Sequence, residues 1–167
     1  MFMRIDDFLK DWAQESALTS RIFGALTDAS LSQAPSKDDR SLGKIAWHIV
    51  TSIPEMLART GLPVTTVTAK TPMPPTAAVI ADAYKKAADE AAKAVRENWT
   101  DDTLDTEDNM YGMMWPRGVT LDVLIRHEIH HRAQMTVLMR MAGLKVPGIY
   151  GPAREEWAAH GMPTPEI

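Results

Sequence analysis

The sequence predicts an all-α protein, a four-helix bundle with long irregular links and a short C-terminal helix. Three observations lead to this class. Apolar residues recur at helical spacing in four long segments, links rich in proline, threonine and aspartate separate them, and no convincing run of alternating apolar and polar residues marks a strand. Because 167 residues suffice for one good core but not for two ordinary domains, we expect a single domain over residues 1–167.

The first two helices are marked by apolar stripes. The first stripe consists of Ile5, Leu9, Trp12, Phe23 and Leu26. Ser16 and Thr19 interrupt this stripe and are expected to face the same interior. The second helix should begin near Ser41 and end at Gly61, with Leu42, Ile45, Ile49, Ile53 and Met56 on its apolar face. Pro54 should bend it, because the proline ring removes a backbone donor.

The remaining helices follow two irregular links. The third helix is alanine-rich, and Thr76 is its expected N-cap. Its thin buried stripe should let a neighbouring helix approach closely. The fourth helix should begin with Thr120 as its cap and run to about Met141, with Gly143 as its stop. A short helix can form in the tail after Pro152.

Composition excludes several classes of function. The 18 basic and 22 acidic residues give a net charge of -4, and no Lys/Arg block could hold a phosphate backbone, so we expect no nucleic-acid partner. Neither a signal peptide nor an apolar run of about 18 residues is present, which predicts a cytoplasmic protein without a membrane partner. Since the chain has no cysteine, any metal ion must be held by nitrogen and oxygen.

Histidines are the most informative residues of the chain. In the segment RHEIHHRAQM, His127 and His131 lie about 40° apart on a helix, on its apolar arc. His48 shares the buried arc of the second predicted helix. His130 falls on the flank, and His160 lies in the tail.

Two interpretations of the inward histidines are open. A lone buried histidine such as His48 is ordinarily a core residue with hydrogen-bond partners, and the pair on the fourth helix could be coincidence. Each buried imidazole costs free energy without such partners, however. Burial of three imidazoles is better explained if one cation binds them all.

Three segments carry a resemblance to a known family: IAWHIV, HEIHHRAQM and MRMAGLKVPGIYGP. Together they resemble the DinB/YfiT-like family of metal-binding four-helix bundles, over nearly the whole chain. The most specific matches are His127, Glu128, His131, Arg132, Gln134, Arg140, Gly143, Val146 and Pro147. The resemblance implies a divalent metal ion, zinc or nickel, bound by His48, His127 and His131. Ala133 stands where the family often has glycine.

The segment also satisfies the H-E-x-x-H pattern of zinc proteases. Those enzymes take a third ligand downstream and pair the helix with a substrate-binding strand, whereas this chain offers only His160 and no clear strand. Glu128 lies about 100° round the helix from His127, so its position does not prove a role as general base. It remains a catalytic candidate, or a buried acceptor that orients Arg132 or a ligand imidazole. Gln134 could line the cavity or simply pack.

Three functions are compatible with such a site. Three protein ligands leave coordination positions open, as in catalytic zinc sites. By resemblance to thiol-dependent members of the family, the metal ion would activate a low-molecular-weight thiol in an S-transferase reaction. Alternatively, it would activate water as a metal-dependent hydrolase of a small substrate. A non-catalytic metal-binding or stress-related protein is the third hypothesis.

The sequence also suggests pocket walls and an interface. The candidate walls are Trp12, Ser16, Thr19, Ser52, Glu55, Tyr111 and Trp115. Ile125, Ile129 and Thr136 fall on the face of the fourth helix opposite the histidines, where a lone bundle would expose them. Such a stripe suggests a homodimer, as the family resemblance also implies, unless the C-terminal tail folds over it.

Overall fold

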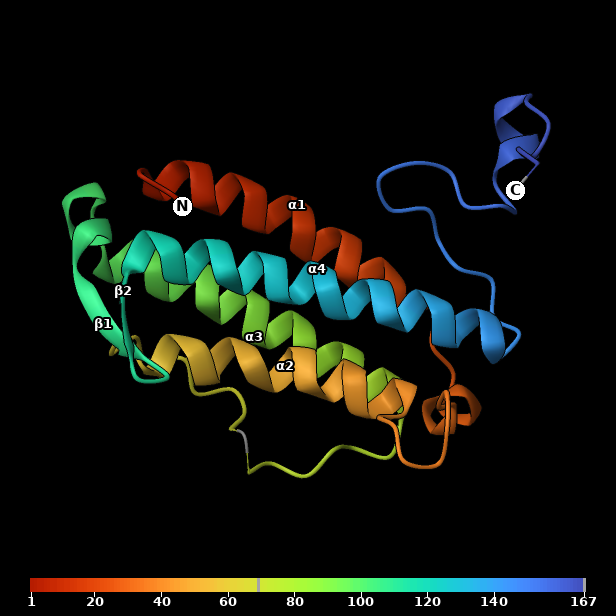
Figure 1. Ribbon diagram of the computed structural model, residues 1–167, viewed down its shortest axis with the longest axis horizontal. Coiled ribbons are helices and arrows are strands. Elements are labelled where there is room, and N and C mark those ends of the chain that lie inside the picture. The colour runs from red at the N-terminus through yellow and green to blue at the C-terminus, as the bar shows by residue number, and fades with distance from the viewer. Residues whose placement is uncertain (69, 167) are drawn as a thin grey trace.

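Four long helices dominate the computed structural model, which describes residues 1–68 and 70–166 (Figure 1). They are α1 (Ile5–Gly24), α2 (Leu42–Ala58), α3 (Ala77–Asn98) and α4 (Arg117–Met141). Short 3-10 turns, η1 (Asp28–Ser32), η2 (Asp101–Asp105) and η3 (Trp157–His160), complete the helical part. Ala69, in a predicted loop, and Ile167, at the end of the predicted domain, lie outside the described residues. The chain is thus mostly helical, as predicted.

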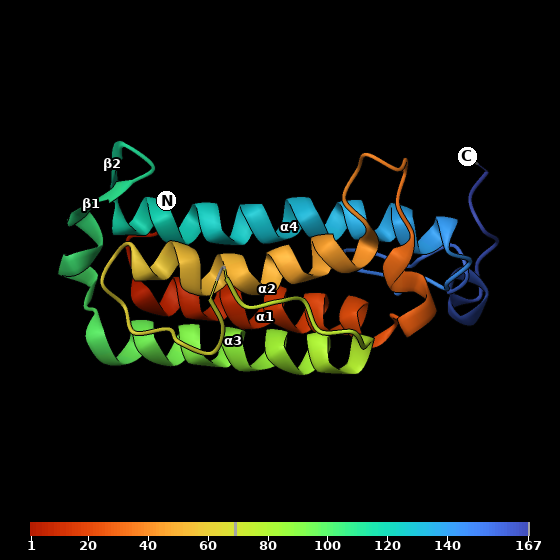
Figure 2. The same ribbon diagram turned by 90° about the horizontal axis from the view of Figure 1, so that it is seen from below.

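The four helices pack along one another (Figure 2). α1 contacts α3 and α4, and α2 contacts the same two helices. α3 presents the small side chains of Ala87, Ala91 and Ala94, all buried, which lets its neighbours approach closely. The large core side chains include Trp12, Ile49 and Ile53 of the predicted apolar stripes, and also Phe8, which the predicted stripe of α1 did not contain.

The helix boundaries correct two of the predicted caps. Ser41 caps α2 as expected, because its hydroxyl accepts from the Lys44 backbone N–H at 3.3 Å. Thr76 makes no such bond to α3, and the Asp28 carboxylate instead accepts from the Ala77 N–H at 2.7 Å. Thr120 is buried inside α4, which begins earlier, at Arg117, directly after a strand.

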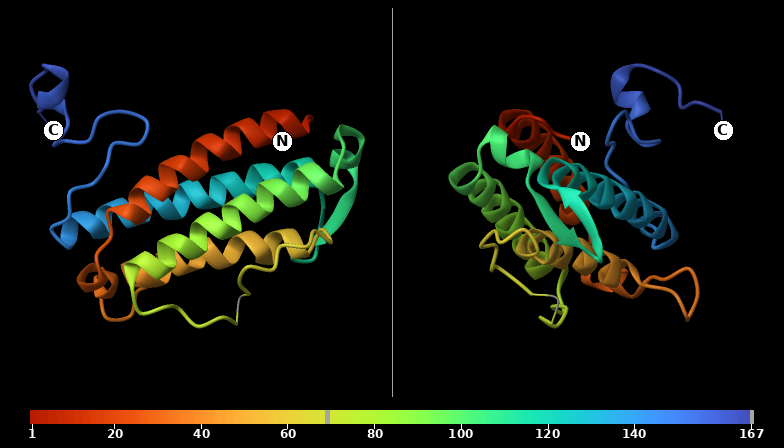
Figure 3. Two further views of the ribbon diagram at one scale, coloured as in Figure 1. Left: turned by 180° about the vertical axis from the view of Figure 1, so that it is seen from behind. Right: turned by 60° about the vertical axis from the view of Figure 1, so that its left-hand side comes forward.

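A β-hairpin stands at one end of the helices, where the sequence suggested only an irregular link (Figure 3). Its strands β1 (Glu107–Met110) and β2 (Met113–Pro116) pair antiparallel. Tyr111 and Gly112 form the turn with φ of 58° and 88°, the left-handed backbone that two-residue hairpin turns require. The absence of strands was therefore a wrong prediction. Its cause is the strand length of four residues, too short for alternation to be visible.

A buried polar cluster joins α1, α3 and α4. Arg132 forms an ion pair with Glu15 at 2.6 Å and donates to the Thr19 hydroxyl at 2.9 Å. Glu128 accepts from Thr19 at 2.7 Å and from the Tyr84 hydroxyl at 2.8 Å. All five side chains are buried. These long-range bonds fix the rotation of α4 about its axis, and with it the direction of the histidines.

The C-terminal tail turns back beyond the end of α4 and then leads to η3, which stands apart from the four helices and lies where a short helix was predicted (Figure 1). The Tyr150 hydroxyl donates to Glu15 at 2.7 Å and accepts from Arg132 at 2.6 Å. Ile149 and Tyr150 face Ile129 and Thr136 across a small cavity of about 220 Å³. Among the helices of the described ranges, none has the length and apolarity needed to cross a membrane.

Candidate metal centre

Three histidines meet in the groove between α2 and α4. His48 extends from the middle of α2, while His127 and His131 lie one turn apart on α4. The polar cluster occupies another side of α4 and turns the two imidazoles toward α2. All three side chains are half-buried. They line a groove rather than the bundle interior predicted from the helical arc, because the core side of α4 is taken by Glu128 and Arg132.

The ring nitrogens of the triad converge. His127 Nε2 lies 3.2 Å from His48 Nε2 and 3.2 Å from His131 Nε2. One ligand nitrogen from each histidine lies within 4.8 Å of the other two. Nitrogens bound to one zinc ion at about 2.0–2.1 Å in a tetrahedral arrangement are about 3.3 Å apart. The donor set therefore fits a divalent transition metal ion, and a histidine triad could hold one here.

The outer nitrogens of two of the three imidazoles, those of His131 and His48, lie next to polar neighbours. His131 Nδ1 lies 2.8 Å from Gln134 Oε1, an oxygen that can only accept, so Nδ1 carries the proton. The Gln134 amide group in turn donates to His130 Nε2 at 3.2 Å. His48 Nδ1 lies 3.4 Å from the Ser52 hydroxyl, which donates to the His48 carbonyl. This arrangement leaves the Nε2 lone pairs directed at the centre of the triad.

Electrostatics favours the neutral imidazoles that a metal ion requires. Burial and the neighbouring His131 lower the pKa of His48 to about 4, with a further contribution from Arg40. Burial, with His131 and His48 close by, lowers the pKa of His127 to about 4. Burial also lowers the pKa of His131, although its bond to Gln134 opposes the shift. At pH 7 all three are therefore free of a competing proton.

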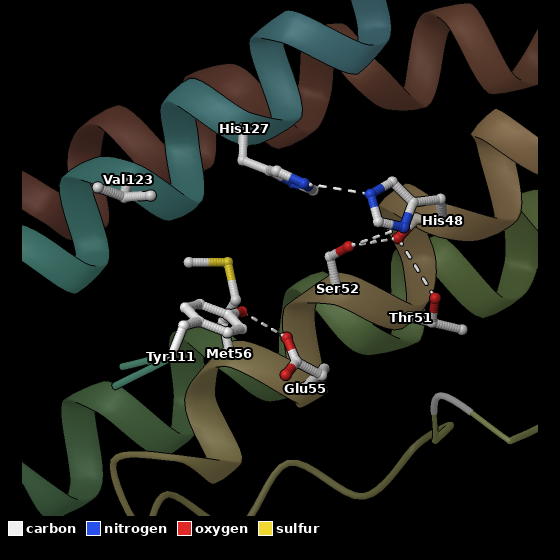
Figure 4. Close-up of a pocket in the computed structure, with 8 residues that line it drawn as sticks. All are labelled: His48, Thr51, Ser52, Glu55, Met56, Tyr111, Val123 and His127. Atoms are coloured by element: carbon white, nitrogen blue, oxygen red, sulfur yellow. Dashed lines mark hydrogen bonds between the residues drawn. The ribbon is translucent and has the colours of Figure 1, made fainter. Parts of the chain in front are cut away.

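A cavity of about 410 Å³ opens on the hairpin side of the triad (Figure 4). His48 and His127 stand on one side of it, and Glu55 and Tyr111 on the other. The Tyr111 hydroxyl donates to Glu55 at 2.6 Å, and the remaining carboxylate oxygen of Glu55 accepts from Arg59 at 2.8 Å. The other walls of the cavity are Thr51, Ser52, Met56 and Val123.

A second cavity, of about 420 Å³, opens on the opposite side of the triad. His131 and Gln134 form its inner wall. The link that precedes α2, orange in Figure 2, passes beside the C-terminal half of α4 and supplies the outer wall. Pro35, Asp39, Arg40, Ile45, Val137, Leu138 and Met141 complete the lining. The histidines are thus reached from two different cavities.

Most of the predicted site residues lie at the triad or along its cavities. His48, His127, His131 and Gln134 come together, and Ser52, Glu55 and Tyr111 line the hairpin-side cavity as expected. Trp115 packs edge-on against Tyr111 behind that cavity. Trp12 and Thr19 are buried in the core, and Ser16 faces a separate groove between α1 and α3, so these three are not pocket walls of the triad.

Glu128 points away from the imidazoles. Its Oε1 bonds to Thr19 and Tyr84, and its buried Oε2 has no partner within the described residues. Burial raises the pKa of its carboxyl to about 7. Glu128 is thus a buried acceptor, as one interpretation expected, although its hydrogen bonds go to Thr19 and Tyr84 rather than to Arg132 or an imidazole. A catalytic role for Glu128 stays a prediction.

Arg40, Thr51 and Val123 line the cavities but were not predicted. Arg40 lies in an irregular link, where no periodicity tells which way a side chain faces. Thr51 and Val123 lie at positions of α2 and α4 that are ordinarily exposed flanks. Only the helix pairing, which the sequence alone does not specify, could have identified them.

Replacement of Gln134 by alanine is expected to weaken metal binding about tenfold, the lower end of the range for outer-shell partners, because Gln134 is exposed. Without the Oε1 acceptor the His131 ring is free to rotate and to change tautomer. Competition with a chromophoric chelator would measure the change. Gln134→Glu keeps an acceptor and should retain near wild-type affinity. Equal affinities for the alanine variant and the wild type would show that Gln134 does not orient the ligand.

The fold and the triad together define the class: a protein of four long helices with a metal-compatible histidine cluster between two of them. The chain belongs to the DinB family, whose model matches residues 1–166. It is 44% identical over 167 residues to a protein named Uncharacterized protein YrdA from Bacillus subtilis strain 168, with 100% of both chains covered.

Solved structures agree with this assignment. A DinB-like protein from Bacillus cereus ATCC 10987 is 44% identical and superimposes with a TM-score of 0.86, over 90% of this chain and 100% of that one. A DinB-like protein from Bacillus subtilis, YjoA, is 18% identical with a TM-score of 0.67, over 86% of this chain and 97% of that one. At this lower identity the second likeness concerns the fold alone.

Proposed function

We propose that this protein is a four-helix bundle that binds one divalent metal ion, zinc or nickel, through His48, His127 and His131, and that it is a thiol-dependent S-transferase. The observation that carries the proposal is the convergence of three Nε2 atoms, with both measured separations at 3.2 Å. His127 Nε2 carries either one proton or one lone pair, so it cannot make a well-formed hydrogen bond to both neighbouring imidazoles. A shared cation removes this difficulty.

The two cavities support a reaction between two molecules. A metal ion bound by three protein ligands supplies an open coordination position and lowers the pKa of a thiol that occupies it. His131 and Gln134 face one cavity, and His48 and His127 face the other, so two reactants can approach from opposite sides. In the transfer, the thiol proton passes to solvent, the sulfur bonds to an electrophilic carbon, and the leaving group departs with its electron pair.

The neighbouring carboxylates favour transfer over hydrolysis. Glu128 faces the core, and Glu55 is engaged by both Tyr111 and Arg59. Neither of these carboxylates is free to remove a proton from a water molecule at the triad, and the Asp39 carboxylate of the second cavity accepts from the Ser36 hydroxyl. A thiol that ionises in the site needs no such base, because its pKa is closer to neutrality than that of water.

The test is turnover of a small thiol with a generic electrophile, 1-chloro-2,4-dinitrobenzene, by protein with its metal content determined. We expect about one zinc or nickel ion per chain, conjugation above the uncatalysed rate, and loss of that excess rate on chelation with recovery on metal return. Turnover of small esters or amides without any thiol would identify a hydrolase instead. A metal-loaded protein inactive in both assays across a broad panel would contradict both enzymatic functions.

Assembly stays a prediction. Of the apolar stripe that suggested a homodimer, Ile125 is buried and Ile129 and Thr136 are half-buried. Ile149 and Tyr150 of the tail lie beside the latter two, which is in keeping with the alternative of a tail folded over the stripe. A homodimer is therefore supported by the family relationship alone. The predicted cytoplasmic location likewise stays a prediction.

A further inference from the structure

Arg40 is the cationic side chain of the second cavity. It lies at the end of the link that precedes α2, and it lines the same cavity as His131 and Gln134. A ligand bound at the imidazoles and extending into this cavity therefore meets a guanidinium group.

Within residues 1–68 and 70–166, no carboxylate forms an ion pair with this guanidinium, although that of Asp39 lines the same cavity. The ion pairs found there engage Arg59, Arg117, Arg126, Arg132, Arg140 and Arg154. Asp39 also lines the cavity, but the bond recorded for its carboxylate is from the Ser36 hydroxyl at 2.7 Å. The five guanidinium donors of Arg40 are thus available to a ligand.

The hairpin-side cavity has the opposite character. Its nearest guanidinium, that of Arg59, is bound to Glu55 and stacks 4.2 Å from the centre of the Tyr111 ring. Its remaining walls are neutral, with Met56 and Val123 as apolar contacts. The guanidinium of Arg59 is therefore already engaged by a carboxylate, whereas Arg40 in the second cavity has no ion-pair partner within the described residues. The two sides of the triad differ in whether a guanidinium group is open to a ligand.

We propose that Arg40 binds a carboxylate of the thiol substrate in the second cavity, and that the uncharged electrophile occupies the hairpin-side cavity. This inference rests on the proposed function and names the substrate class, an acidic low-molecular-weight thiol. A carboxylate matches the single planar fork of one guanidinium. A phosphate group, with nearly two charges, would find no second cation among the residues that line this cavity. Ile45, Leu138 and Met141 offer apolar contact to the carbon chain between sulfur and carboxylate.

The experiment compares matched thiols that differ only in charge. Zinc-loaded protein would be titrated in a calorimeter with two pairs of thiols, each consisting of a carboxylate and the matching amide. The first pair is 3-mercaptopropionate and 3-mercaptopropionamide. The second pair is 6-mercaptohexanoate and 6-mercaptohexanamide, in which the carbon chain between the sulfur and the carboxylate is longer. We expect the acid to bind about threefold to tenfold more tightly than its amide in at least one pair. Arg40→Gln should abolish this preference while leaving the amide affinity unchanged.

Two further variants test whether the preference for the acid depends on the guanidinium of Arg40 or only on a positive charge in this link. Arg40→Lys retains the charge without the planar fork and should retain part of the preference. Lys37→Gln removes one positive charge from an exposed position of the same link, outside both cavities, and should change nothing. Circular dichroism would verify folding, and metal analysis would verify the zinc content of each variant.

The outcomes distinguish this inference from the proposed function. If wild-type protein takes up zinc but binds acid and amide equally, or if Arg40→Gln keeps the preference, the role of Arg40 is refuted and the metal site stands. If wild-type protein takes up no zinc, nickel or cobalt, the proposed function fails and the inference fails with it.

Discussion

The His127→Ala variant is expected to purify without stoichiometric metal, whereas the wild type carries about one ion per chain. His127 Nε2 is the atom that the other two ligand nitrogens both approach to 3.2 Å, so its loss leaves two imidazoles with no nitrogen between them. Two imidazoles alone rarely hold a zinc ion, whose protein sites have at least three ligands. Plasma mass spectrometry after dialysis against metal-free buffer would measure the loss.

The matched control is His160→Ala, which removes a histidine from the exposed turn η3 and should retain the ion. The His127 side chain is half-buried and makes no bond to the core, so the variant should remain folded, as circular dichroism would show. Retention of a full equivalent of metal by His127→Ala, with affinity equal to that of the wild type, would refute the triad as the binding site.

The Arg132→Ala variant is expected to lower the free energy of unfolding by about 3–5 kcal/mol. Glu15 would then be a buried carboxylate without its ion-pair partner, and Thr19 and Tyr150 would each lose a charged donor. Urea denaturation of the metal-free protein would measure the change. Metal should be excluded with a chelator, because binding to the folded state alone would add stability of its own.

Two comparisons identify the cause of this loss. The double variant Arg132→Met/Glu15→Gln removes both charges and should recover a large part of the stability, since the main penalty is the unpaired charge. Arg140→Ala, in the last turn of α4, breaks an ion pair with Glu155 that is largely exposed to water and should have a much smaller effect. If Arg132→Ala and Arg140→Ala were equally mild, the buried cluster would not determine the stability of the protein.

The histidine triad was predictable because its cause is local. His127 and His131 share a face through the helical repeat, and the apolar neighbours of His48 mark the side of α2 that packs. The position of the histidines in a groove, and not in the bundle interior, was not predictable in this way. Which side of α4 forms the core depends on Glu15 and Thr19 of α1, more than a hundred residues away in sequence. A helical wheel contains no information about such partners.

The hairpin and Arg40 escaped prediction for a related reason. The strands have four residues each. The first turn residue, Tyr111, has a positive φ, which is uncommon for a residue with a side chain, so the sequence did not indicate a turn there. Tyr111 itself was correctly placed at the pocket. Arg40 is one of several charged residues in a link. Its place in the lining of the second cavity follows only from the path of that link beside α4, which the sequence does not reveal.

The separation of the two sides of α4 has a consequence for protein engineering. The buried polar cluster holds the helix from the side of α1 and α3, while Val137 and Met141 on the groove side are largely exposed and line the second cavity. Val137 and Met141 are 60% and 51% exposed, so changes there should alter stability by no more than about 0.5 kcal/mol. The shape of the groove can therefore be redesigned for new reactants by substitution at these positions, without rebuilding the core that orients the histidines.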